Sequence, residues 1–182
     1  PRFCSTRTSF DKLLYRAKQD VRRRHKEAGL HRAFFFTSLS ADTVVYKALA
    51  TGADLSRFYP ELRDPRFLTR FAMFHRRFST NTQSSWDKAQ PCRILCHNGE
   101  INTIGGNRTW ARSRELALGL PPEELLTHEG ISDSGSLNEV VEALRYKSSI
   151  PFVEDVLAIL IPPARRDSEY YEFWGRAMEP WD

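Results

Sequence analysis

Three short groups of polar residues have the types and spacing that could bind a small polar ligand. The first group is Arg77, Thr80 and Asn81, at the end of an alternating apolar stretch. A guanidinium offers a rigid fork of donors that matches a carboxylate, and nearby hydroxyl and amide groups can fix the orientation of a ligand. The same residue types are ordinary at a solvated strand end, so the pattern alone leaves both interpretations open.

The second group is His97-Asn98-Gly99, which follows a short apolar run. The side-chain amide of Asn98 and the backbone N–H of Gly99 are suited to donate together to an oxyanion, because glycine has no Cβ to crowd the approach. Asn-Gly is also a common turn dipeptide, so a plain turn is the alternative.

The third group is Ser132-Asp133-Ser134, placed just before a segment with helical patterning. The Asp133 carboxylate could hold the ammonium group of a substrate. Asp and Ser at such a position also serve as helix caps, and capping alone is the competing interpretation.

The three cysteines are Cys4, Cys92 and Cys96, an odd number that argues against a disulfide framework and suits a reducing compartment. A metal site that combines Cys92, Cys96 and His97 is disfavoured. In an extended segment the two cysteines would lie roughly 13 Å apart, and His97 would point to the opposite face. No activating base flanks Cys92 or Cys96, so both are interpreted as small buried hydrophobic residues.

Composition favours one globular domain. The 182 residues are 41% hydrophobic, with a formal net charge of +4. No run reaches the roughly 18 apolar residues that a membrane span needs, so we expect a soluble cytoplasmic protein, with a plastid also open. The basic segment 12–26 could attract nucleic acid, but Phe10, Leu13 and Leu14 recur at helical spacing and predict that these charges lie on a solvated helix face.

The elements that must position these groups are of mixed type. Ser9 and Gly29 predict the start and stop of a helix over about 10–28, and a capping box of Ser136 and Glu139 predicts the start of another. Hairpin-type links and polar turns favour a mixed α and β layered domain over regular alternation. Strands are predicted over 31–38, 43–49, 70–79 and 92–96, and further helices over about 104–118, 153–160 and 166–177.

Several motifs, in one order, resemble the class II glutamine amidotransferase domain of glutamate synthase. The resemblance covers nearly the whole chain. It rests on Arg77-Phe78-Ser79-Thr80-Asn81-Thr82, Ser85-Trp86-Asp87, Ala89-Gln90-Pro91, His97-Asn98-Gly99-Glu100-Ile101-Asn102-Thr103, Gly106-Asn107-Arg108, Trp110-Ala111-Arg112, Ser132-Asp133-Ser134 and Met178-Glu179-Pro180-Trp181-Asp182. Gly135, Asn138 and Gln83-Ser84 depart from the family pattern, and we expect them to adjust packing rather than chemistry.

The resemblance implies an α+β fold, the four-layer αββα arrangement of N-terminal-nucleophile hydrolases with stacked antiparallel sheets. A partial amidotransferase domain over 1–182, cut at both ends, is expected. The implied reaction is the hydrolysis of L-glutamine to glutamate and ammonia. By resemblance, Arg77 would hold the α-carboxylate and Asp133 the α-ammonium, with Thr80 and Asn81 lining the pocket. Asn98 and Gly99 would form the oxyanion hole.

The nucleophile that the resemblance implies is a cysteine at the start of the mature protein, with its own α-amino group as the base. Pro1-Arg2-Phe3-Cys4-Ser5 does not match that start, so the chain by itself is expected to be inactive. No cofactor is expected in this chain. FMN, an iron-sulfur cluster, and ferredoxin or an NADPH-oxidising subunit are implied for the full-length enzyme, whose other domains would aminate 2-oxoglutarate. The alternatives are another class II amidotransferase and a non-catalytic glutamine-binding module.

Overall fold

The computed structural model describes residues 2–30, 34–76, 85–97, 101, 104–117, 119–120, 131–147 and 156, with the side chains of 2–9 left aside. Its elements in chain order are α1 (Arg2–Glu27), α2 (Leu55–Phe58), the short 3-10 helix η1 (Pro60–Arg63), α3 (Ile104–Ala117) and α4 (Asp133–Lys147). The predicted helices at 153–160 and 166–177 lie outside the described residues, apart from Val156, which is helical and buried.

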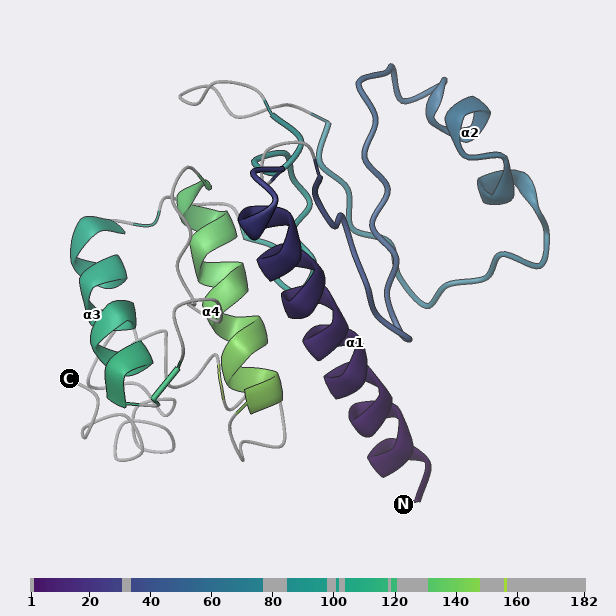
Figure 1. Ribbon diagram of the computed structural model, residues 1–182. Coiled ribbons are helices and arrows are strands. Elements are labelled where there is room, and N and C mark those ends of the chain that lie inside the picture. Colours follow the sequence, from purple (N-terminus) through teal and green to yellow (C-terminus); the bar gives the residue numbers. More distant parts are fainter. Residues whose placement is uncertain are drawn as a thin grey trace, which may run out of the picture.

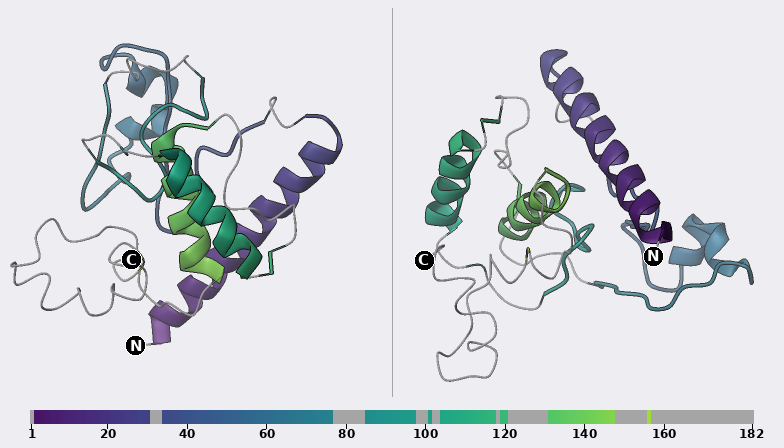
Figure 2. Two further views of the ribbon diagram at one scale, coloured as in Figure 1. Left: turned by 90° about the vertical axis from the view of Figure 1, so that its left-hand side faces the viewer. Right: turned by 90° about the horizontal axis from the view of Figure 1, so that it is seen from below.

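Helix α4 is the central one of the three long helices. Helix α4 lies between α1 and α3 and contacts both, while α2 and η1 pack on each other at the far side of α1 (Figures 1 and 2). The buried apolar cluster is centred on Val140, Val141, Ala143 and Leu144 of α4, and the remaining members come from α1, the 92–96 segment, α3 and the region of Val156. Helix α4 is therefore the element against which the rest of the core packs. No helix in the described part of the chain is long and apolar enough to cross a membrane.

The predicted helix stop at Gly29 is confirmed, and a second glycine, Gly119, follows α3. Gly29 has φ 71° and Gly119 has φ 60°, a region where side chains with a Cβ are strained. After α1, the Gly29 N–H donates to Lys26 and the Leu30 N–H to His25, which satisfies carbonyls at the helix end. The start of α1 differs from the prediction, because the helix begins at Arg2 rather than near residue 10. Neither glycine nor proline lies between Arg2 and Glu27, so nothing in the sequence interrupts the helix.

The buried face of α1 was predicted wrongly. The apolar residues Phe10 and Leu13 are 51% and 58% exposed, whereas Tyr15, Lys18 and Gln19 are buried. The face that packs against α4 is rotated from the apolar stripe toward charged residues. The reason lies in the partner helix, because α4 presents the carboxylates that pair with these cations.

The predicted strands are not formed in the described residues of the chain. Segments 34–38, 43–49, 70–76 and 92–96 have no strand assignment, although the chain does bend at the predicted turn near Ala41. A strand requires its N–H and C=O groups to pair with a neighbour. Here backbone N–H groups donate to side chains instead, Ala41 to Asp11 at 2.9 Å and Val45 to Ser38 at 3.0 Å.

Candidate active site

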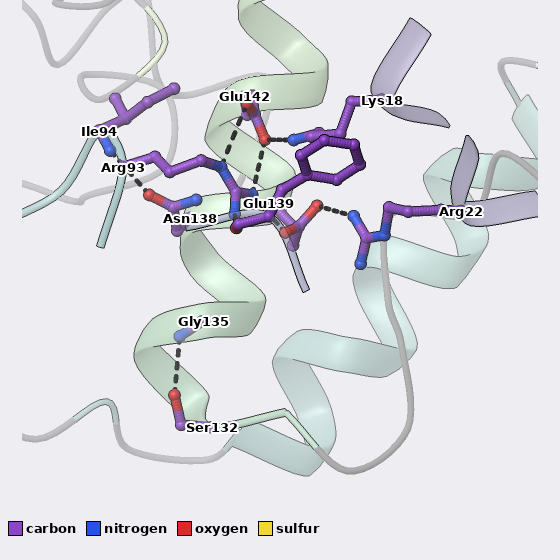
Figure 3. A network of polar contacts seen from close by, with 10 residues as sticks. Lys18, Arg22, Arg93, Ile94, Ser132, Gly135, Asn138, Glu139 and Glu142 are labelled. Atoms are coloured by element: carbon purple, nitrogen blue, oxygen red, sulfur yellow. Dashed lines mark hydrogen bonds and ion pairs between the residues drawn. The ribbon is translucent and has the colours of Figure 1, made fainter. Parts of the chain in front are cut away.

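The N-terminus of α4 carries the third group of predicted residues. Ser132 is its cap: the Ser132 Oγ accepts the Gly135 N–H at 3.0 Å, and the Ser132 carbonyl accepts the Ser136 N–H at 2.8 Å (Figure 3). The predicted cap at Ser136 is therefore wrong. Ser136 is buried inside the helix and donates its hydroxyl back to the Ser132 carbonyl at 2.9 Å. Ser132 and Ser136 are both serines that could cap the helix. Ser132 is the one that reaches a free N–H group of the first turn.

Asp133 is the first residue of α4 and is partly exposed. Its Oδ1 accepts the backbone N–H of Ser134 at 2.7 Å. Among the described residues no group donates to Oδ2. The arrangement can hold an ammonium group without giving up the helix cap, because the capping role belongs to Ser132.

The second predicted group meets the third through its first residue. The ring Nε2 of His97 lies 2.7 Å from the Ser134 Oγ. Ser134 follows Asp133 directly, and Asn98 follows His97 directly. Two groups separated by more than thirty residues in the sequence are thereby joined by a hydrogen bond between their members.

The segment that leads to His97 lies along one face of α4. The Ile94 N–H donates to the Asn138 Oδ1 at 2.9 Å, and the Arg93 guanidinium contacts Glu142 at 2.8 Å. Positions 134, 138 and 142 are spaced by four residues and so share a helix face. The 93–97 segment runs antiparallel to α4 and ends beside its N-terminus.

A buried ion-pair network holds α1 and this segment onto α4. Glu142 pairs with Lys18, whose side chain is 1% exposed, and Glu139 pairs with Arg22 at 2.6 Å (Figure 3). Arg93 pairs with both carboxylates, and its side chain is 9% exposed. Three cations thus share two carboxylates, which satisfies charges that would be costly to bury alone.

The pKa values of the cations follow from this setting. Burial lowers the pKa of Lys18, against the opposing effect of Glu139 and Glu142. Burial also acts to lower the pKa of Arg93, but the two carboxylates outweigh it and raise that pKa above its usual range. Arg93 is the better-matched cation, because its guanidinium can bond to both carboxylates at once.

Helix α3 holds the start of α4 from a second side. The Nη2 of Arg108 donates to the Ile131 carbonyl at 3.0 Å and to the Ser136 Oγ at 3.1 Å. The residues that flank Asp133 are therefore fixed both by α3 and by the 93–97 segment. Sequence reasoning quoted Arg108 only as part of a motif and assigned it no role.

The cysteines are placed as follows. The Cys92 thiol is partly buried and donates to Gln90 Oε1 at 3.3 Å, and burial raises its pKa. Cys96 is exposed, against the prediction that both are buried. No group of three or more potential metal-ligating side chains occurs in the described ranges. The side chain of Cys4 is not among those described.

Of the predicted site residues, the structure places Asp133. Arg77, Thr80, Asn81, Asn98 and Gly99 lie outside the described residues. The residues that sequence reasoning missed are those of the buried network and the Asn138 amide. A weak signal was available, since Glu139 and Glu142 interrupt an otherwise apolar stretch of helix and a buried carboxylate requires a partner. Nothing local to α4 indicates that the partners come from α1 and from residue 93.

Comparison with known proteins identifies the family. A family model for glutamine amidotransferases class-II matches residues 3–182. The chain belongs to this family.

Its relatives include glutamate synthases, which confirms the resemblance seen in the motifs. The chain is 37% identical to the NADH glutamate synthase of Saccharomyces cerevisiae over 187 residues, which is 96% of the chain and 9% of that protein. It is 39% identical to the chloroplastic ferredoxin-dependent glutamate synthase 2 of Arabidopsis thaliana, over 81% of the chain and 10% of that protein. Identity to the NADPH glutamate synthase large chain of Azospirillum brasilense is 39%, over 82% of the chain and 11% of that protein. The chain spans about a tenth of the length of these relatives, and no solved structure matches it.

Proposed function

We propose that this chain forms the glutamine-binding part of the amidotransferase domain of a glutamate synthase. The proposed reaction is hydrolysis of L-glutamine to glutamate and ammonia, with the ammonia passed on to the amination of 2-oxoglutarate in the full-length enzyme. The observation that carries the proposal is the hydrogen bond between His97 and Ser134, at 2.7 Å. It brings together the segment preceding Asn98 and Gly99 and the helix start that carries Asp133.

The roles follow the chemistry of the substrate. An amino acid presents a carboxylate and an ammonium group, which match the Arg77 guanidinium and the Asp133 carboxylate. The second oxygen of Asp133 accepts no hydrogen bond within the described part of the chain, which supports this role. Thr80 and Asn81 would line the pocket beside Arg77.

The amide end of glutamine is where the bond breaks. A cysteine thiolate adds to the amide carbon, and the carbonyl oxygen becomes an oxyanion that the Asn98 side chain and the Gly99 N–H would stabilise. Ammonia then leaves with a proton from the catalytic base. Water cleaves the thioester, which gives glutamate and regenerates the thiol.

We further propose that the nucleophile is none of the cysteines of this chain. Cys92 and Cys96 lie deep inside the matched domain, so their nitrogens are peptide amides and cannot act as the basic amine, and the residues around Cys4 do not resemble the family's opening. The raised pKa of Cys92 also disfavours the thiolate there. The 182 residues alone are accordingly expected to lack glutaminase activity.

The remaining cofactors and partners belong to other parts of the enzyme. Relatives named for ferredoxin, NADH and NADPH are all similar to this chain, so the similarity leaves the electron donor open. FMN and an iron-sulfur cluster remain predictions for the full-length protein. L-glutamine is the ligand proposed for the residues of this chain.

The test is glutamine hydrolysis by the full-length protein and by its Asn98→Ala variant. Loss of one oxyanion donor should lower kcat by about 100-fold to 1,000-fold, with a much smaller change in KM for glutamine. The split is expected because the oxyanion exists only near the transition state. Absence of glutamine hydrolysis by the full-length wild-type protein would contradict the proposal, as would an unchanged kcat in the variant.

A further inference from the structure

Two side chains of α4, Ser134 and Asn138, fix the position of the 93–97 segment along that helix. We call these two contacts between α4 and the segment the seam. The Asn138 Oδ1 accepts the Ile94 backbone N–H at 2.9 Å, and the Ser134 Oγ lies 2.7 Å from the His97 ring. The bond from Asn138 is to the main chain, so it fixes the backbone of the segment directly. Asn138 is buried, which excludes water as an easy replacement partner.

The ends of this seam lie next to two predicted ligand-binding positions. Asp133 precedes Ser134, and Asn98 follows His97. Consecutive Cα atoms are about 3.8 Å apart, so the seam restrains how far these two positions can separate. A slip of one residue along α4 would displace the segment by about 3.3 Å, far more than a reacting group tolerates.

We propose that Ser134 and Asn138 are positioning residues that keep the segment preceding the oxyanion donors in register with Asp133. This inference rests on the proposed function. The residues have separate roles. Asp133 binds the amino acid, while Ser134 and Asn138 keep Asn98 and Gly99 at a fixed distance from that ligand. Arg93 clamps the far end of the seam through Glu142 and Glu139.

The surroundings of Asn138 allow a conservative replacement. The adjacent network contains the cations Lys18, Arg22 and Arg93 and the carboxylates Glu139 and Glu142. An aspartate at position 138 keeps the acceptor oxygen and would bring three carboxylates to three cations. Leucine has a similar volume but no acceptor, so it leaves the Ile94 N–H unpaired.

The experiment compares glutamine hydrolysis by the full-length enzyme carrying Asn138→Leu, Asn138→Asp or Ser134→Ala. Asn138→Leu is expected to lower kcat by about 10-fold to 100-fold, because misplacement by about 1 Å has that effect on a reaction. KM for glutamine should stay within about three-fold, since the groups that bind the ground state are intact. Ser134→Ala should show the same split with a smaller loss, and Asn138→Asp should keep kcat near the wild-type value.

Two controls separate positioning from damage to the fold. Ser113→Ala on the exposed face of α3 removes a hydroxyl that, within the described part of the chain, bonds to its own helix at Thr109, and should leave kcat unchanged. Calorimetric titration with L-glutamate counts the sites that still fold, so kcat can be expressed per folded site. A loss that disappears on this normalisation would overturn the inference.

The remaining outcomes are equally decisive. The inference is wrong if Asn138→Leu and Ser134→Ala keep kcat per site, or if Asn138→Asp is as impaired as Asn138→Leu. Failure of the proposed function would be seen separately, as absence of glutamine hydrolysis by the wild-type enzyme, and the inference would fall with it.

Discussion

At the scale of single residues, the division between capping and binding at the start of α4 is the informative feature. The sequence Ser132-Asp133-Ser134 left open whether Asp133 caps the helix or binds a ligand. The Ser132 hydroxyl fills the capping role at 3.0 Å from the Gly135 N–H, which leaves an oxygen of Asp133 without a donor in the described residues. Cap and binding residue could not be separated from sequence, because serine and aspartate cap with similar strength.

Of the departures from the family pattern, Gly135 and Asn138 lie within the described residues, whereas Gln83-Ser84 lie outside them. Gly135 donates its N–H to the cap, and a Cβ built there would lie 3.1 Å from the Ser132 Oγ. Asn138 accepts the Ile94 N–H. Both residues act on local packing and hydrogen bonding, and the effect of Asn138 on catalysis is a matter for the kinetic experiment on that residue.

The cysteines lead to a prediction at the residue scale. Cys92 and Cys96 should differ in reactivity toward an alkylating reagent near neutral pH, with Cys96 modified first. Cys96 is exposed, whereas burial shields Cys92 and raises its pKa, so less reactive thiolate is present there. Peptide mass spectrometry of the full-length protein after a timed exposure measures both rates.

Raising the pH should speed the alkylation of Cys92, because more of its thiol then ionises. Alkylation of Cys92 at least as fast as that of Cys96 would contradict the placement. A separate control is glutamine hydrolysis by the full-length Cys96→Ser variant, which should persist because Cys96 is not the proposed nucleophile.

At the scale of elements, helices were predicted better than strands for a physical reason. Helix hydrogen bonds join residues four apart, so caps, stops and periodicity are all local. The predicted helix over 104–118 therefore agrees closely with α3, and Gly29 and Gly119 mark observed helix ends. A strand depends on a distant partner. In the described residues of 43–49 and 92–96, backbone N–H groups instead donate to side chains, Val45 to Ser38 and Ile94 to Asn138.

The face of α1 shows a second limit. An apolar stripe predicts which face is buried only when the partner surface is apolar. Helix α4 presents Glu139 and Glu142, so Lys18 and Arg22 turn inward while Phe10 and Leu13 remain exposed. The periodicity of α1 correctly predicted a helix. The face of that helix that is buried depends on α4 and could not be predicted from the sequence of α1 alone.

The buried pair of Lys18 and Glu142 gives the prediction at this scale. Glu142→Gln should destabilise the contact of α1 with α4 by about 3–5 kcal/mol, because the Lys18 ammonium stays buried without its carboxylate. Hydrogen exchange of the α4 segment in the full-length protein measures the loss as faster local opening. Combining Glu142→Gln with Lys18→Met should restore much of the protection, since the unpaired charge is removed.

The matched control is Glu27→Gln, which breaks the exposed pair between Glu27 and Arg23 at 3.0 Å. Exposed pairs of this kind contribute little, so protection of α1 and α4 should not change. Equal effects of Glu27→Gln and Glu142→Gln would contradict the view that the buried network joins the two helices.

At the scale of the whole molecule, α4 links the core to the proposed ligand site. It lies between α1 and α3, provides half of the buried apolar cluster and begins at Asp133 (Figure 1). The motifs pointed to the family and to the site residues, and the family match bears out the first of these. The layered sheets that the resemblance implies depend on long-range strand pairing, which local patterns cannot establish.

The chain spans about a tenth of its relatives, and its proposed part in the enzyme is one step, the recognition and hydrolysis of glutamine. In that proposal Asp133 holds the α-ammonium group of the ligand. Glutamate and glutarate differ by that group, because glutarate keeps both carboxylates and lacks the ammonium. Comparing the two ligands therefore isolates the contact of Asp133 from every other contact in the pocket.

The decisive measurement is calorimetric binding of L-glutamate and of glutarate to the full-length protein and its Asp133→Asn variant. The variant should bind glutamate about 10-fold to 100-fold more weakly, the range expected for loss of a hydrogen bond between charged groups. Its affinity for glutarate should be unchanged or slightly higher. An equal loss for both ligands, or no loss for glutamate, would contradict the claim that Asp133 holds the ammonium group.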